Sequence, residues 1–127
     1  MFRREEGQAM VEMALVLPIL LLLLLGIVEF GRVFNAFITV AHVSREAARA
    51  AALGSSDPEI TALALDRAEG LEKARLVIQV TPEPSQRARG TGVEVEVDYS
   101  VPLIAPLLAN LLPNPFPVSA QTTMRVE

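Results

Sequence analysis

The stretch MALVLPILLLLLLGIV, residues 13–28, contains no charged side chain and decides what kind of protein this is. Extended back to Ala9 it is about twenty residues long, and a helix of that length crosses a hydrocarbon core of ~30 Å. A soluble helix that is apolar on every side needs a larger domain to cover it than a chain of 127 residues can build. The stretch therefore predicts a membrane-spanning helix.

The charges that flank this stretch indicate how it sits in the membrane. Arg3 and Arg4 precede it. Because acidic residues count little in the positive-inside rule, we expect the N-terminus in the cytoplasm and the rest outside. A cleavable secretory signal would end in a small-x-small site just past the apolar run, but the nearest good match, residues 48–50, lies far downstream. We therefore expect a single-pass anchor that stays attached.

Glu12 is the informative residue, because it places a carboxylate near the edge of the apolar run. An ionisable group there costs a few kcal/mol unless it reaches water or finds a partner, so it is a functional candidate. Gly7 stands five residues earlier, after a charged leader. A cut after Gly7 would make Gln8 the new terminus and Glu12 the fifth residue of the mature chain. Alternatively, Glu12 lies among the headgroups of an ordinary anchor.

This arrangement resembles the type IV prepilin signal. In that family a membrane-embedded aspartic peptidase cuts on the cytoplasmic side, and the anchor helix remains. The resemblance implies cleavage between Gly7 and Gln8. It also implies an assembly role for Glu12, whose carboxylate neutralises the new α-amine of a neighbouring subunit and fixes the axial register.

Three further stretches sharpen the resemblance: residues 7–18, 26–32 and 45–51. Together they are similar to the TadE-like family, the pseudopilins or minor pilins of tight-adherence pilus systems. The similarity covers about residues 3–53, and its motif positions are Glu29, Gly31, Arg32, Arg45 and Arg49. One position departs: prepilins of this class often carry an aromatic residue after the glutamate, and here Met13 follows Glu12.

The resemblance implies a role in pilus initiation, assembly or tip formation. The implied partners are other pilin subunits, met through the N-terminal helix, a prepilin peptidase and an inner-membrane assembly platform. The implied location is the inner or cytoplasmic membrane, with passage into the pilus on assembly. The alternative is an unprocessed, single-pass envelope protein with a small extracytoplasmic binding domain.

Composition excludes several function classes. The net charge is −4 and cysteine is absent, which argues against a nucleic-acid surface, a disulfide framework or a thiolate site. The single histidine, His42, lacks partners for a zinc set, and Ser44 points away from it on a helix. We expect no enzymatic activity, no cofactor and no metal site.

One acidic strand face is a candidate calcium site. Glu94, Glu96 and Asp98 alternate along a predicted strand, so same-face positions lie about 6.5–7 Å apart, too far for tight convergence. A solvated face balanced by Arg75 or Arg125 is favoured over a calcium site.

Periodicity predicts the remaining elements. The first helix should run from about Ala9 to Leu53, with Gly54 as its cap. Pro18 should kink this helix or unwind one turn of it. Either the bend helps the helix to move from the membrane into a filament, or the proline has no function and is tolerated, as in other membrane helices. A second helix is expected over 58–72 with Asp57 as N-cap. A short β-branched run predicts a strand over 75–81, and strict alternation predicts strands over 93–101 and 118–127.

The expected fold is α+β: a long N-terminal transmembrane helix that continues into a small pilin-like domain. In that domain the second helix packs on a three-stranded antiparallel sheet. We divide the chain into a leader (1–7), the transmembrane and assembly part of the helix (8–30) and an extracytoplasmic domain (31–127). The polar loop 82–90 is expected to be exposed and mobile. The apolar, proline-rich loop 101–113 either covers the open end of the core or contacts a neighbouring subunit or the membrane.

Overall fold

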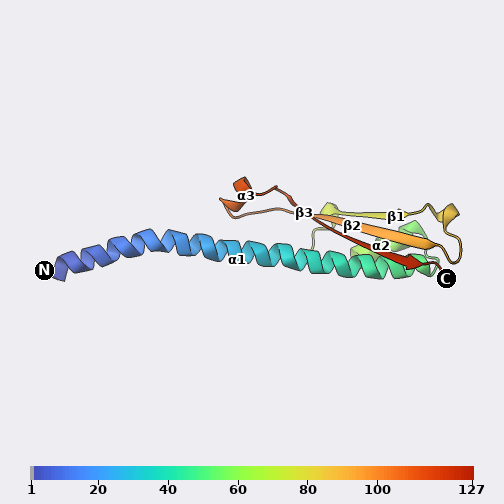
Figure 1. Cartoon of the computed structure of the whole chain (residues 1–127), viewed down its shortest axis with the longest axis horizontal. Coiled ribbons are helices and arrows are strands. Elements are labelled where there is room, and N and C mark those ends of the chain that lie inside the picture. Colours follow the sequence, from blue (N-terminus) through green and yellow to red (C-terminus); the bar gives the residue numbers. More distant parts are fainter. Residues whose placement is uncertain (1) are drawn as a thin grey trace.

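The computed structural model describes residues 2–127, with side chains from Arg3 onward. Its dominant element is α1 (Phe2–Ala52), an unbroken helix of 51 residues that runs the length of the molecule (Figure 1). The remaining elements lie along its C-terminal half, apart from one loop that reaches back toward the N-terminus. The N-terminal part of α1 projects alone.

The projecting part of α1 is the apolar stretch. Among the described residues, α1 is the one helix long and apolar enough to cross a membrane, and none of its most apolar window is buried by the rest of the chain. The side chains are exposed around the whole helix, from Met10 at 74% to Leu22 at 40%. The structure thus supports a single-pass anchor. The helix continues across Pro18, although proline has no N–H to donate, so the expected unwound turn is not found. The N-terminal part of α1 curves (Figure 1).

The turn after α1 is built as the sequence predicts. Gly54 has a φ of +92°, and its N–H donates to the Ala51 carbonyl at 3.1 Å, which closes the last helical turn. The next helix, α2 (Asp57–Arg67), has Ser56 as its N-cap rather than Asp57. Ser56 is preferred over Asp57 as N-cap because it forms a reciprocal capping box with Glu59. Each of the two side chains accepts from the other residue's backbone N–H at 3.4 Å.

The second helix is also shorter than expected. It ends at Arg67 instead of residue 72, and Gly70 follows with a φ of +81°, a conformation that a continuing helix cannot contain. The chain then turns through a short 3₁₀ segment, η1 (Lys73–Arg75), into the sheet. The Glu72 N–H donates to the Tyr99 hydroxyl at 3.0 Å, which fixes this turn against the middle strand.

The sheet contains the three expected strands, β1 (Leu76–Thr81), β2 (Gly92–Val101) and β3 (Phe116–Arg125), in the order β1-β2-β3. Both pairings are antiparallel, and Val97 lies opposite Ile78 on one side and Ala120 on the other. The alternation in β2 is confirmed: Val93, Val95 and Val97 are fully buried, with Glu94 and Glu96 on the other face.

The sheet rests mainly on α1, not on the second helix. Its buried face meets a stripe of small residues on α1, which includes Val40, Val43, Ala47 and Ala51. Small side chains there let the helix approach the sheet closely. The Ser44 hydroxyl, 1% exposed, lies 2.8 Å from that of Thr122 and ties β3 to α1. The α2 helix packs chiefly along α1, and its buried residues are Ile60 and Ala64. The α+β pilin-like layout is confirmed, with α1 as the support of the sheet.

The loop between β1 and β2 is more firmly held than the sequence suggests. The Arg87 side chain is only 7% exposed and donates from Nη2 to the Asp57 carboxylate at 2.6 Å. Its Nε donates to the Pro82 carbonyl at 2.9 Å. A short 3₁₀ segment, η2 (Pro84–Gln86), lies within the same loop. The loop is therefore exposed at its surface but pinned to the start of α2.

Candidate functional site

The predicted cleavage signal lies on exposed turns of α1. Gly7, Gln8 and Glu12 are all helical and solvent-accessible. The Gln8 Nε2 donates to Glu12 Oε1 at 3.5 Å, a long contact between side chains one turn apart. No ion pair to Glu12 is found within residues 3–127. The Glu12 carboxylate is thus open to a cation from outside the described chain.

Gly7 is not required by packing within this chain. A Cβ atom built on Gly7 would meet nothing within 4 Å. Glycine lowers helix stability by roughly 0.5–1 kcal/mol relative to alanine, so the helix is locally weakest at this point. Packing within the chain therefore does not require a glycine here, and recognition of Gly7 by another protein is the remaining explanation.

Glu12 borders an apolar strip of the helix surface. Together with Ala9, Met13, Val16, Leu17 and Leu20 it lines a shallow open groove of about 300 Å³. A carboxylate at the end of such a strip can give direction and register to whatever packs along it, since only one position in the strip carries charge. This geometry suits a second helix with a cation at the matching height.

A second arrangement joins two motif residues of α1 to the loop after β2. The Glu29 side chain is 3% exposed, and its Oε1 accepts from Arg32 Nη1 at 2.8 Å. The same oxygen accepts from the Ile104 N–H at 3.2 Å. Arg32 Nη1 also donates to the Pro102 carbonyl at 3.2 Å. We call these four residues the Glu29–Arg32 clasp.

The clasp leaves one polar atom without a partner. Glu29 Oε2 is buried and has no hydrogen-bond partner among the described residues. Such an acceptor costs about 1–3 kcal/mol, which the packing around it must offset. That packing is apolar and encloses a cavity of about 250 Å³, lined beside Glu29 by Gly26, Phe30, Val33, Leu103, Leu108, Leu112 and Phe116.

The other motif residues do not gather into one site. A Cβ at Gly31 would meet nothing within 4 Å. Arg45 is exposed, and its Nε donates to the Ala41 carbonyl of its own helix at 3.3 Å. Arg49 is exposed in the last turn of α1, where a cation favours the helix dipole. The structure brings Glu29 and Arg32 together and leaves these three apart.

The residues weighed as metal or catalytic candidates are placed as follows. His42 is exposed on α1. On the outer face of β2, Glu96 accepts from Gln121 Nε2 at 3.2 Å. Arg75, expected to balance that face, pairs instead with Glu72 at 2.7 Å. Within residues 3–127 no three His, Cys, Asp or Glu side chains are grouped so as to hold a metal ion.

The clasp was not foreseen from the sequence. Glu29 and Arg32 are motif positions, but their partners lie 70 and 75 residues further along the chain. A usable signal was present: an acid and a base three residues apart at the end of an apolar helix, with an uncharged, proline-rich loop elsewhere. That signal does not say which loop the pair holds.

Removing the acid of the clasp should loosen the loop it holds. Glu29→Ala deletes the acceptor of the Ile104 N–H and the partner of Arg32. Loss of about 1–3 kcal/mol of local stability should raise amide exchange by roughly one to two orders of magnitude. Hydrogen exchange with mass spectrometry on the peptide covering residues 102–112 measures this.

The matched control is Glu72→Ala. It breaks another pair at i,i+3 spacing, Glu72–Arg75, whose side chains are 66% and 37% exposed. Exposed pairs contribute about 0–1 kcal/mol. Glu72 lines a pocket with Pro102, but its side chain bonds to Arg75 and not to the loop. Exchange over residues 102–112 should therefore stay unchanged. Equal exchange in Glu29→Ala and Glu72→Ala would show that the clasp does not hold the loop.

Comparison with known proteins identifies one related segment. Residues 7–49 match the family described as TadE-like protein. The match covers about a third of the chain, all of it within α1, and it includes Gly7, Glu12 and the two clasp residues on that helix. No curated protein and no solved structure matches the chain. The similarity expected from the sequence is confirmed over residues 7–49 and indicates a protein related to tight-adherence pili.

Proposed function

We propose that this chain, with its TadE-like segment in α1, is a pseudopilin or minor pilin of a tight-adherence pilus. A prepilin peptidase removes residues 1–7, and the mature chain takes part in pilus initiation, assembly or tip formation. The observation that carries the proposal is the exposed Glu12 at the start of an uncovered apolar helix, five residues after Gly7.

The electrostatics of Glu12 support this role. Its carboxylate has no ion pair within residues 3–127, and an uncompensated charge at the edge of a membrane is costly. Cleavage after Gly7 creates an α-amine at Gln8, one helical turn away. In a bundle of staggered helices, the amine of one subunit can meet the Glu12 carboxylate of the next. Both charges are then neutralised at a defined axial offset.

The uncovered surface of α1 supports assembly through this helix. None of its most apolar window is buried within the chain, so lipid surrounds it before assembly and other helices can replace the lipid afterwards. The proposed partners are other pilin subunits, the peptidase and an inner-membrane assembly platform. The proposed orientation places residues 1–7 in the cytoplasm and residues 31–127 outside, following the positive-inside rule.

The alternative is an unprocessed, anchored envelope protein with a small binding domain. One observation favours it: the Gly7–Gln8 bond lies inside α1, so a peptidase that binds an extended substrate must first unwind this turn. Because helix ends fray and glycine weakens the helix, that cost is small.

Intact-mass analysis of the protein extracted from membranes tests the proposal. With an active prepilin peptidase, the chain should begin at Gln8 and keep its anchor. Without the peptidase it should begin at Met1. Mechanical shearing of the cells then separates filaments from membranes, and the mature chain should be found with the filaments. A chain that keeps Met1 in the presence of the peptidase would favour the unprocessed anchor.

A further inference from the structure

The loop between β2 and β3 does not turn back over the sheet. Residues 102–115, which we call the apolar loop, leave β2 and run along α1 toward its N-terminus (Figure 1). The loop contains a single helical turn, α3 (Leu108–Leu111). Only Leu103 and Ala105 are buried, at 7% and 3% exposure. The expected covering of the open core is thus limited to the first residues of the loop.

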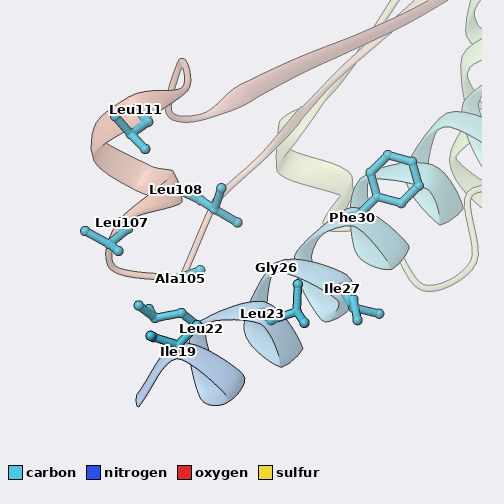
Figure 2. Close-up of a pocket in the computed structure, with 10 residues that line it drawn as sticks. All are labelled: Ile19, Leu22, Leu23, Gly26, Ile27, Phe30, Ala105, Leu107, Leu108 and Leu111. Carbon is cyan, nitrogen blue, oxygen red and sulfur yellow. The ribbon is translucent and has the colours of Figure 1, made fainter. Parts of the chain in front are cut away.

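Most of the remaining apolar loop is exposed, and it faces α1 across a groove. Exposed fractions reach 68% at Ile104, 52% at Leu107 and 77% at Leu111. Figure 2 shows Leu107, Leu108 and Leu111 on one side of the groove and Leu22, Leu23 and Gly26 on the other. The groove measures about 550 Å³, and every residue that lines it is apolar or glycine.

The groove lies beside the predicted membrane span. Its α1 wall runs from Ile19 to Phe30, the C-terminal half of the predicted transmembrane part (8–30). At ~1.5 Å per residue this wall covers about 16 Å, half of a hydrocarbon core of ~30 Å. When α1 spans a bilayer, the apolar loop must lie at the depth of the leaflet next to the folded domain.

The chemistry of the apolar loop suits that depth. No charged residue occurs between Asp98 and Arg125. Four prolines, at 102, 106, 113 and 115, remove backbone N–H donors that lipid could not satisfy. Several remaining N–H groups donate within the protein. That of Leu103 donates to the Asn114 side chain and that of Ile104 to Glu29. Those of residues 109–112 donate to carbonyls of residues 105–108.

We propose that the apolar loop inserts into the adjacent membrane leaflet and that lipid acyl chains fill the groove between it and α1. The Glu29–Arg32 clasp holds the loop at the rim, where Arg32, 38% exposed, can reach the headgroups. The groove continues directly into the lipid-facing surface of α1. It offers no hydrogen-bonding or charged side chain that would select a protein partner. Two points of attachment then fix the tilt and rotation of the domain on the membrane.

The proposal rests on the anchor and not on the pilus function, so it can be tested on the uncleaved chain. The protein contains no tryptophan, and a single introduced tryptophan therefore reports on one place. Leu111→Trp places it on the exposed loop, and Leu22→Trp marks the membrane span. Leu53→Trp is the matched control, an exposed leucine (62%) in the turn just after the C-terminal end of α1. Leu107→Trp repeats the loop measurement at a second position.

The full chain is reconstituted in phosphatidylcholine vesicles, with and without bromine atoms on the acyl chains. Leu111→Trp and Leu107→Trp should be quenched by brominated lipid nearly as strongly as Leu22→Trp, with emission shifted to shorter wavelength. Leu53→Trp should be quenched by aqueous acrylamide and not by bromine. Loop tryptophans quenched no more by bromine than Leu53→Trp would overturn the proposal. Acrylamide quenching would then indicate water in the groove, and protection that falls on dilution with lipid would indicate a second copy.

Discussion

Gly7→Ala is expected to leave residues 1–7 on most chains, while the folded domain is unchanged. A Cβ at Gly7 would meet nothing within 4 Å, so the substitution introduces no clash inside the protein. The defect must then arise in the peptidase, where one extra methyl group in a tight site costs about 1–3 kcal/mol, or roughly 10–200-fold in rate. Alanine also stabilises the helical turn that has to unwind, by roughly 0.5–1 kcal/mol. Both effects slow cleavage.

Gly31→Ala is the matched control for this experiment. It adds the same methyl group to the same helix at another position where a Cβ meets nothing within 4 Å. Co-expression with the peptidase, followed by intact-mass analysis over time, measures the fraction of each variant that begins at Gln8. Gly31→Ala should be processed like the unmodified chain. Equal processing of Gly7→Ala would remove the main reason to place the cut after Gly7.

Glu12→Ala should separate processing from assembly. The variant keeps Gly7 and the leader, so it should still be cut. The α-amine of a neighbouring subunit would then lose its counter-charge in an apolar setting. Removing one partner of such a buried pair costs roughly 3–5 kcal/mol, which corresponds to a fall of more than two orders of magnitude in incorporation. The amount of mature chain in the sheared filament fraction, relative to membranes, is the measurement.

Glu46→Ala serves as the control, because it also removes a carboxylate from α1 but lies in the part of the helix beside the folded domain. It should leave both cleavage and incorporation unchanged. Full incorporation of Glu12→Ala would mean that the carboxylate only occupies the headgroup region, as in an ordinary anchor. Loss of cleavage in Glu12→Ala would instead assign Glu12 to peptidase recognition.

The anchor and the sheet were predictable because each depends on a local pattern. An uncharged run long enough to cross a bilayer has few soluble alternatives, and strict alternation in Val93–Val101 leaves one face for the core. The Gly54 cap followed from the same kind of reasoning, because glycine readily adopts the positive φ that ends a helix. The structure confirms a positive φ at Gly54. Each of these features depends on residues that are close together in the sequence, so backbone geometry and the period of the side chains are sufficient to predict it.

The misplaced boundaries show where local signals compete. Ser56 and Asp57 are both good N-caps, and the choice fell to Ser56 because Glu59 stands three residues after it and completes the capping box. The second helix stops before its apolar stripe does, because Gly70 adopts a positive φ and the chain turns toward Tyr99. The stripe alone could not reveal this contact with a strand not yet formed.

The sequence by itself determined that residues 13–28 of α1 are apolar on every side and that Glu12 lies at the edge of this stretch, five residues after Gly7. It also determined that three strands follow, two of them strictly alternating. Only the tertiary structure decided that the sheet rests on α1 and that Glu29 and Arg32 hold a loop 70 to 75 residues away. It also decided that this loop lies beside the membrane span. Periodicity records which faces must be covered but not which segment covers them. That choice depends on distances between elements, which exist only once the chain is folded.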